Sequence, residues 1–255
     1  MNEFRLIIDP PMNAAVNMAR DRAILERQSM KNPLPTLRIY RWSAPSVTLG
    51  YFQKLDDFVN TAFCRKNGIS VTRRVTGGGT VLHHMELTYS FTVPVKKKIV
   101  PESVEGSFSV IIAPIIKALK HFSIEAVYRP VNDIVICGKK ISGSAQVRKK
   151  GILQQHGTLL MDIDDELVCS ALKSNHTKLK SRGFNKHSEA VTTLCRELKR
   201  GFNEDFTDEL IAKLVFCFME SFNANFSLAE LSEAENAIME RYINKFNSSE
   251  WNYMK

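Results

Sequence analysis

Five short strand-like runs separated by glycines occupy residues 126–161. The runs are 126–128, 133–137, 140–141, 152–153 and 158–161. Gly138, Gly143 and Gly151 stand between runs, where a chain that reverses direction needs unusual backbone angles. Because consecutive short strands without intervening helices usually pair as neighbours, this spacing predicts a meandering antiparallel sheet.

The remaining patterns add further strands and a helical C-terminal third. Apolar or alternating runs predict strands at 37–42, 47–50, 69–73 and 87–93. Apolar residues at helical spacing predict helices at 12–28, 56–67, 103–121, 165–170, 188–199, 207–222 and 228–246. Pro114 is expected to kink or interrupt the helix at 103–121, and the polar stretch 173–187 is predicted to be a loop. Clustered strands followed by helices indicate an α+β fold.

Composition favours a globular protein of one large domain, or of one domain with a small appendage. The chain has 255 residues, 44% hydrophobic and 24% charged. No apolar run is long enough to cross a bilayer and no signal segment is evident, so we expect a cytoplasmic protein without membrane contact. The net charge of +8 comes from scattered residues without aromatic interleaving, so nucleic acid is not the expected partner.

The five cysteines stand at positions 64, 137, 169, 195 and 217. They form no CxxC pair and have no metal-ligand spacing with the histidines. We therefore expect reduced thiols and predict no protein-held metal site.

Three consecutive glycines, at 77–79, follow a predicted strand that ends in Arg73 and Arg74. No Lys-Ser or Lys-Thr pair follows them, which excludes a Walker loop, and they lack the spacing of a dinucleotide fold. Three glycines alone more often mark a tight turn or a bulge. The arginines favour an anion site, because a guanidinium suits carboxylate or phosphate oxygens and bare backbone permits close approach. His83, taken alone, is explained as a polar residue at a sheet edge.

Lys140 lies in a second dense segment, residues 138–146, beside the small residues 142–145. An exposed strand lysine is the simplest interpretation of Lys140 alone. The small residues have little packing value and leave room for a bound molecule, which favours a ligand site with Lys140 as its cation. The pair at 132–133 and the triplet at 156–158 can each be structural, as a turn and as a histidine bonded to the backbone.

Taken in order, these segments resemble the signatures of lipoate-protein ligases. Residues 73–83 are similar to the family's Arg-Arg-x-Ser-Gly-Gly-Gly-Ala-Val-x-His segment. The pair 132–133, the block 140–145 and residues 156–160 match its other motifs in the same order. The resemblance runs from roughly the first helix to Trp251. Three ordered motifs are far more specific than any one of them.

The resemblance implies a biotin/lipoate ligase-type fold, with a mixed, largely antiparallel sheet flanked by helices. In such enzymes lipoate or octanoate and ATP, with Mg²⁺ on the phosphates, form an acyl-adenylate. The acyl group then passes to a lysine of a small acidic lipoyl carrier domain, which a basic protein would attract. Lys140 is implied as the catalytic residue, a fixed ammonium beside the acyl–phosphate bond.

The resemblance also implies which residues bind the substrates. Arg74, Thr76 and His83 would line the acyl pocket, residues 77–80 would offer backbone donors, and residues 132–133 would lie near the adenylate. The full set implied to bind substrate or adenylate is Arg73, Arg74, Thr76, Gly77, Gly78, Gly79, Thr80, His83, Asn132, Asp133, Gly143, Ser144, Ala145, His156, Gly157 and Thr158.

Two departures leave alternatives open. Residues 1–255 are expected to form a single catalytic domain with no accessory domain after it, so a separate accessory chain is a candidate partner. Residues 86–90 are more similar to the octanoyltransferase branch, which takes an acyl group from a carrier protein without ATP through a cysteine thioester. The segment 124–130, where that cysteine would lie, has none, and Cys137 is the transferase's only candidate.

Two further hypotheses rank below these. A non-catalytic binding module with the same fold could have lost Lys140, and this chain has kept it. A biotin ligase carries a different glycine–arginine loop and ranks last.

Overall fold

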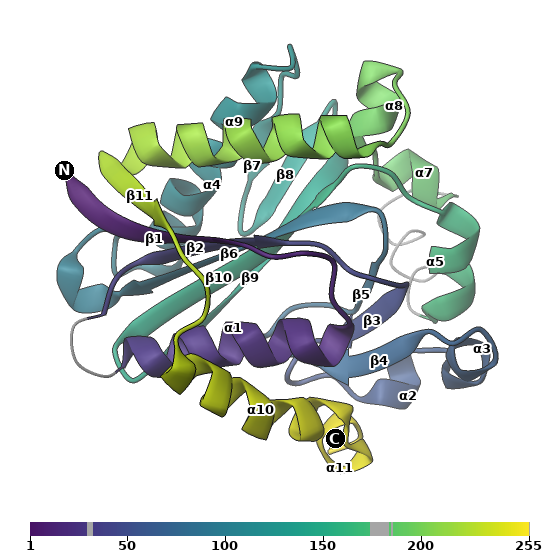
Figure 1. Ribbon diagram of the computed structural model, residues 1–255. Coiled ribbons are helices and arrows are strands. Elements are labelled where there is room, and N and C mark those ends of the chain that lie inside the picture. The colour runs from purple at the N-terminus through teal and green to yellow at the C-terminus, as the bar shows by residue number, and fades with distance from the viewer. Residues whose placement is uncertain (30–32, 174–183, 185, 255) are drawn as a thin grey trace.

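The computed structural model of the chain describes residues 1–29, 33–173, 184 and 186–254. Its centre is an eight-stranded sheet with the order β11-β1-β2-β6-β10-β9-β8-β7 (Figure 1). Strand β1 is parallel to both neighbours, and the other pairs of this sheet are antiparallel. The strands are β1 (Asn2–Ile8), β2 (Thr36–Tyr40), β6 (Glu86–Pro94), β7 (Val127–Arg129), β8 (Asp133–Ile136), β9 (Lys139–Lys149), β10 (Ile152–Leu160) and β11 (Ala224–Leu228).

The predicted meander is confirmed, because β7, β8, β9 and β10 pair in sequence order. Gly138 and Gly151 lie in its turns with φ of 81° and 76°, angles that favour glycine. Gly143 was expected to separate two strands, but it lies inside the continuous strand β9. Because Gly143 has no side chain, the side chain of a neighbouring lysine can lie beside it, as described below.

A second sheet of three strands, in the order β4-β3-β5, carries the glycine segment. Strands β3 (Ser46–Leu49) and β4 (Ser70–Arg73) are parallel, and β5 (Val81–His83) is antiparallel to β3. The segment 74–80, called here the glycine loop, connects β4 to β5. The helix predicted at 56–67 is instead two short helices, α2 (Leu55–Phe58) and α3 (Thr61–Lys66). They separate at Val59, which has extended backbone and pairs with Leu172.

Helices cover both faces of the large sheet (Figure 1). Helices α1 (Ala14–Gln28) and α10 (Glu233–Asn247) pack on one side, and α4 (Val104–Lys120) and α9 (Glu204–Phe222) on the other. Helix α4 continues through Pro114, which is buried, so the expected break does not occur. The shorter helices are η1 (Val95–Lys97), α5 (Asp165–Ala171), α7 (His187–Ala190), α8 (Leu194–Leu198) and α11 (Ser249–Asn252).

Two strands that pair across long sequence distances were missed by the local patterns. Strand β1 pairs with β11 and β2, and the helix predicted from residue 228 starts only at Glu233. Ser232 and Glu235 form a capping box there. The carboxylate of Glu235 also accepts hydrogen bonds from Nη1 and Nη2 of Arg5, at 2.7 and 2.6 Å. The capped start therefore fixes α10 to β1.

The segment after residue 173 differs from expectation in one further respect. The helix predicted at 188–199 is divided into α7 and α8, because the intervening Val191 pairs with Lys140 of β9. The predicted loop at 173–187 lies largely outside the described residues.

An aromatic cluster fills the core between the large sheet and the helices α4 and α9. The ring of Phe91 lies 5.0 Å from Phe222, 5.8 Å from Phe218 and 5.7 Å from Phe4. Offset and tilted rings at such distances add to the burial of apolar area. No helix among the described residues is both long and apolar enough to cross a membrane.

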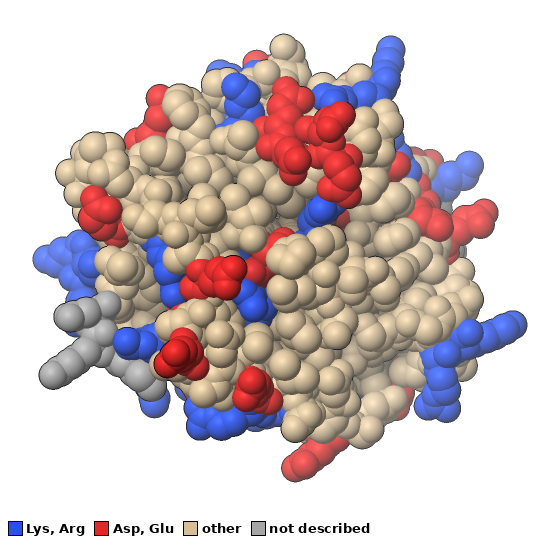
Figure 2. All heavy atoms as spheres, viewed as in Figure 1, with Lys and Arg blue, Asp and Glu red and all other residues tan. Residues whose placement is uncertain are grey.

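Charged side chains of both signs share the face seen in Figure 2. Acidic side chains gather over the region of α9, and basic ones are spread around them (Figure 2). The net charge of +8 is therefore not collected into one basic surface on this face.

Arg73 fastens the C-terminal residues to the small sheet. Its side chain is fully buried, and its three nitrogens donate to five main-chain carbonyls. These carbonyls belong to Gly50, Tyr51, Gln53, Trp251 and Asn252. In return, the indole of Trp251 donates to the carbonyl of Arg73 at 2.8 Å. A single guanidinium thus provides hydrogen bonds for the carbonyls of two irregular segments that lie far apart in sequence.

We predict that Arg73→Met lowers the free energy of unfolding by at least about 3 kcal/mol, because several buried carbonyls lose a charged donor. Urea denaturation followed by far-UV circular dichroism measures this. The control Arg65→Met, at an exposed position of α3, should stay within about 0.5 kcal/mol of the parent. Equal stability of the two variants would show that Arg73 does not hold these segments.

Candidate active site

A cavity of about 390 Å³ lies between the two sheets and the segment that carries α5 and α7. Its size is that of small-molecule sites. Most of the residues that the sequence singled out line it: Arg74, Gly78, Gly79, Thr80, His83, Asn132, Asp133, Lys140, Gly143, Ser144, Ala145, His156, Gly157 and Thr158.

Three of the predicted residues do not line this cavity. The guanidinium of Arg73 donates to main-chain carbonyls, as described above, and the side chain of Thr76, within the glycine loop, is fully buried. Gly77 lines a neighbouring hollow instead. The pattern Arg-Arg could not reveal this, because adjacent residues of a strand point to opposite sides.

Lys140 projects from β9 into the middle of the cavity. Its Nζ lies 2.6 Å from Oδ1 of Asp133, on the adjacent strand β8, and its side chain remains 35% exposed. A Cβ added at Gly143 would lie 2.4 Å from this Nζ, so the end of the lysine side chain would have to move. Gly143 is therefore required for Lys140 to lie across the backbone and reach Asp133.

The glycine loop is held by the side chain of Arg74 and by a close main-chain contact with Gly50. Arg74 Nη2 donates to the carbonyls of Gly77 and Gly79, each at 2.7 Å. Burial lowers the pKa of Arg74 to about 10, which leaves it charged at neutral pH. A Cβ on Gly50 would lie only 2.0 Å from the carbonyl oxygen of Gly78. Arg74 thus borders the cavity while it shapes the loop.

The inner end of the cavity is apolar and aromatic. Met18, Tyr40 and Trp42 line it, and all three are buried. The ring of His83 stacks on Trp42 with centroids 3.8 Å apart, and the Trp42 indole donates to Thr88 at 2.9 Å. This end accepts an apolar chain and keeps water away from it.

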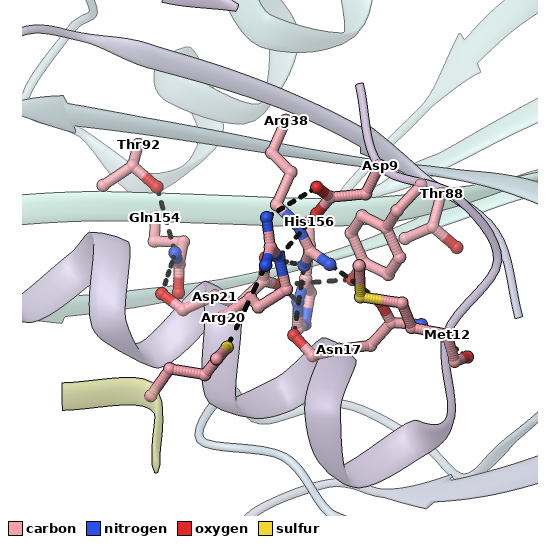
Figure 3. Close-up of polar contacts among 12 residues, drawn as sticks. Asp9, Met12, Asn17, Arg20, Asp21, Arg38, Thr88, Thr92, Gln154 and His156 are labelled. Atoms are coloured by element: carbon pink, nitrogen blue, oxygen red, sulfur yellow. Dashed lines mark hydrogen bonds and ion pairs between the residues drawn. The ribbon is translucent and has the colours of Figure 1, made fainter. Parts of the chain in front are cut away.

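A chain of buried hydrogen bonds runs from helix α1 to the glycine loop, and Figure 3 shows the residues at its beginning, Asp21 and His156. His156 Nδ1 lies 3.1 Å from Asp21 Oδ2, and His156 Nε2 lies 2.7 Å from Thr76 Oγ1. Thr76 in turn accepts from Arg74 Nε at 3.0 Å. The donors and acceptors of this chain are consistent if neutral His156 donates a hydrogen bond to Asp21 and accepts one from the Thr76 hydroxyl.

The charges of this chain support that assignment. Burial lowers the pKa of His156, although its bond to Asp21 opposes the effect. Burial alone would raise the pKa of Asp21, but Arg38 and His156 outweigh it and hold that pKa below its usual value. An ionised Asp21 facing a neutral imidazole therefore fixes the tautomer of His156 and the position of Thr76.

The cavity lining also contains residues of the segment around α5 and α7 that the sequence did not single out. They are Ile163, Val168, Leu172, His187 and Val191, and we call them the outer lobe. Helical and loop residues that meet a site only through tertiary packing leave no motif. Asp21 was also missed, although an acidic residue inside the apolar stripe of a helix was a usable signal.

None of the five cysteines, all within the described residues, lines the cavity. Cys137, the candidate thioester residue, is exposed in the turn between β8 and β9 with φ of 47°. The described residues also contain no group of three His, Cys, Asp or Glu side chains placed to hold a metal ion. The ionisable side chains that line the cavity include Lys140, Asp133, His83 and His156.

The profile of the lipoyl protein ligase A/B catalytic domain matches residues 13–215. The chain belongs to this family. Octanoyltransferase LipM of Clostridioides difficile (strain 630) is 31% identical, with 99% of each chain covered. The family that the sequence motifs predicted is thereby confirmed.

Solved structures agree with the family and confirm the biotin/lipoate ligase-type fold. One is a chain from an archaeal lipoylation system, a bi-partite lipoate protein ligase and its E2 lipoyl domain from Thermoplasma acidophilum. It has a TM-score of 0.86 and 27% identity over 99% of this chain and 97% of that one. Another is a lipoate-protein ligase A bound with ATP, with a TM-score of 0.82 and 25% identity over 98% of both chains.

The buried histidine gives a pH prediction. Because its folded pKa lies below the unfolded value of about 6.5, the unfolded chain binds the proton first as pH falls. The stability that His156 contributes is therefore complete above about pH 6.5 and is lost as pH falls below it. We expect His156→Gln to show a shallower loss of unfolding free energy between about pH 7 and 5.

Urea denaturation at several pH values measures this dependence. The control His121→Gln, at the exposed end of α4, should follow the parent curve. Parallel curves for His156→Gln and the parent would contradict the assignment of a neutral buried imidazole.

Proposed function

We propose that the chain transfers an octanoyl or lipoyl group onto the lysine of a lipoyl domain. One observation carries the proposal: Lys140 Nζ, held at 2.6 Å by Asp133, lines the same cavity as the buried side chains of Met18, Tyr40 and Trp42. A medium-chain acyl group in the inner end would bring its carbonyl carbon beside this ammonium. The remaining cavity would hold the leaving group.

Lys140 would stabilise the negative charge that develops on the acyl carbonyl oxygen as the acceptor amine attacks. A cation held in place by a neighbouring carboxylate needs no reorganisation at that moment, so its effect on the rate is large. Asp133 also pairs with Arg129 at 3.0 Å, which holds its carboxylate in position. The Asp21–His156–Thr76 chain would hold the glycine loop against the acyl group.

The first candidate donor is an acyl thioester on a carrier protein, as in an octanoyltransferase. The match to LipM over nearly the whole of both chains supports it. The absence of a cysteine from the cavity lining favours direct transfer. In that step the lysine nitrogen forms an amide bond to the acyl carbon, the carbon–sulfur bond breaks, and the carrier leaves as a thiol.

The second candidate donor is an acyl-adenylate made from lipoate and ATP. It is favoured by the likeness to a lipoate-protein ligase A bound with ATP. Here the carboxylate attacks the α-phosphate, pyrophosphate leaves, and AMP leaves when the lysine amine attacks. Magnesium would be held by the phosphates, because the described residues offer no cluster of ligands for it. An accessory chain would belong to this second route.

Intact mass of an unmodified lipoyl domain distinguishes the donors. We expect the domain to gain one octanoyl group from octanoyl-carrier protein without nucleotide, and Cys137→Ser to leave this gain unchanged. A gain only with free acid and Mg·ATP would establish the second route. Loss of transfer in Cys137→Ser would instead restore a thioester intermediate, and no gain from either donor would contradict the proposed function.

Two substitutions test the role of Lys140. Lys140→Ala removes the cation and should lower the transfer rate on the order of 100-fold or more. Gly143→Ala keeps Lys140 but displaces its ammonium, so it should also lower the rate on the order of 100-fold. Gly201→Ala is the matched control, because a Cβ at Gly201 meets nothing within 4 Å. Near-normal turnover in Lys140→Ala would overturn the assignment.

A further inference from the structure

A second hollow adjoins the cavity on the side of the glycine loop. The two share four lining residues, Gly78, Asn132, Ser144 and Ala145. Beyond them the hollow is walled by Val104 and Phe108 of α4 and by Val131, and Gln146 and Arg148 of β9 lie along it. We call this hollow, lined by Val104, Phe108, Val131, Gln146 and Arg148, the side groove.

We propose that the side groove receives the side chain of the acceptor lysine of the lipoyl domain. This inference rests on the proposed function and deepens it, because it assigns the path by which the amine reaches the acyl carbon. The side groove meets the cavity at lining residues that the two share, among them Asn132 and Ser144, and none of Met18, Tyr40 and Trp42 lines it.

The compartments around Lys140 support this assignment. The acyl chain fits the apolar inner end, and the outer lobe is left for the donor's leaving group. Attack on a carbonyl needs the nucleophile to arrive by a path that neither of these groups fills. The side groove is a third compartment that meets the cavity, at the strand next to the one that carries Asp133.

The walls of the side groove suit the stem of a lysine. Val104 and Val131 are each 54% exposed, while Phe108 is buried beneath them. A lysine buries its four methylenes along apolar surface and carries its ammonium beyond them. The amide-rich arm of an acyl carrier would instead leave polar groups without partners against these three side chains. The chemistry of the walls therefore favours the lysine over the carrier's arm.

The rim of the side groove is positively charged and held in place. Arg148 donates to the carbonyl of Glu102 at 2.6 Å and to Ser107 Oγ at 2.8 Å. Gln146 donates to Ser107 and to Gln155, at 3.1 and 2.7 Å. Such a rim suits acidic side chains that flank the acceptor lysine.

The experiment compares two acceptors with one acyl donor: the unmodified lipoyl domain, and hydroxylamine, which needs no groove. The test variant is Val104→Asp, which places a carboxylate on the wall at the first turn of α4, where helices accept acidic residues. We expect KM for the lipoyl domain to rise about tenfold or more, since the carboxylate would lose water when the apolar lysine stem packs against it. Transfer to hydroxylamine should change less than about twofold.

Val127→Asp is the matched control. Val127 is 58% exposed on the neighbouring strand β7 and lies outside the side groove. Its KM for the lipoyl domain should equal that of the parent. Thermal unfolding of all variants shows whether any effect on transfer comes from a damaged fold.

A charge exchange provides the second test. Arg148→Glu should raise KM for the lipoyl domain, and an acidic-to-lysine change beside the acceptor lysine should restore it. A rise in KM for the carrier donor, but not for the lipoyl domain, would assign the side groove to the carrier's arm and overturn the proposal. Equal effects on both acceptors, or no effect of Val104→Asp, would also overturn it. Failure of the parent protein with both acceptors would instead contradict the proposed function.

Discussion

The buried guanidinium of Arg38 orients the residues on which the rest of the site is built. It is fully buried on β2 and pairs with Asp9 at 2.6 Å and with Asp21 at 2.7 Å (Figure 3). Asn17 of α1 accepts from the same group at 2.7 Å. Buried ion pairs of this kind stabilise little in net terms, because desolvation offsets their attraction. Their effect here is positional: α1 is held on the sheet in the register that aims Asp21 at His156.

The motifs located the site better than they explained it. Lys140, Asp133 and the small residues beside them meet in one cavity, because neighbouring antiparallel strands bring residues 133 and 143 opposite one another. The same reasoning misassigned the purpose of Gly143, which gives space rather than a turn. Arg73 and Arg74 were predicted together as an anion site, yet most of the hydrogen bonds that both donate go to protein carbonyls. A sequence shows a cation but not the carbonyls that tertiary folding brings to it.

The limits of the fold prediction have a similar origin. The meander between 126 and 161 could be predicted since its contacts are local. Strands β1 and β11 pair across more than 200 residues, and no sequence pattern within either strand indicates its partner. Helix 56–67 and helix 188–199 were each divided by one residue that pairs with a distant strand or helix end. In these places a tertiary hydrogen bond prevailed over local helical preference.

Arg73 and Trp251 join the last described helix to the strand that runs into the glycine loop. The indole, the amide of Asn252 and the guanidinium form one continuous polar network with residues 50–53, and Gly50 in turn touches the loop carbonyl. The C-terminal end is thus connected to the backbone that borders the cavity. In practice, an affinity tag or a fluorescent fusion placed after α11 would disturb the enzyme more than one placed before β1.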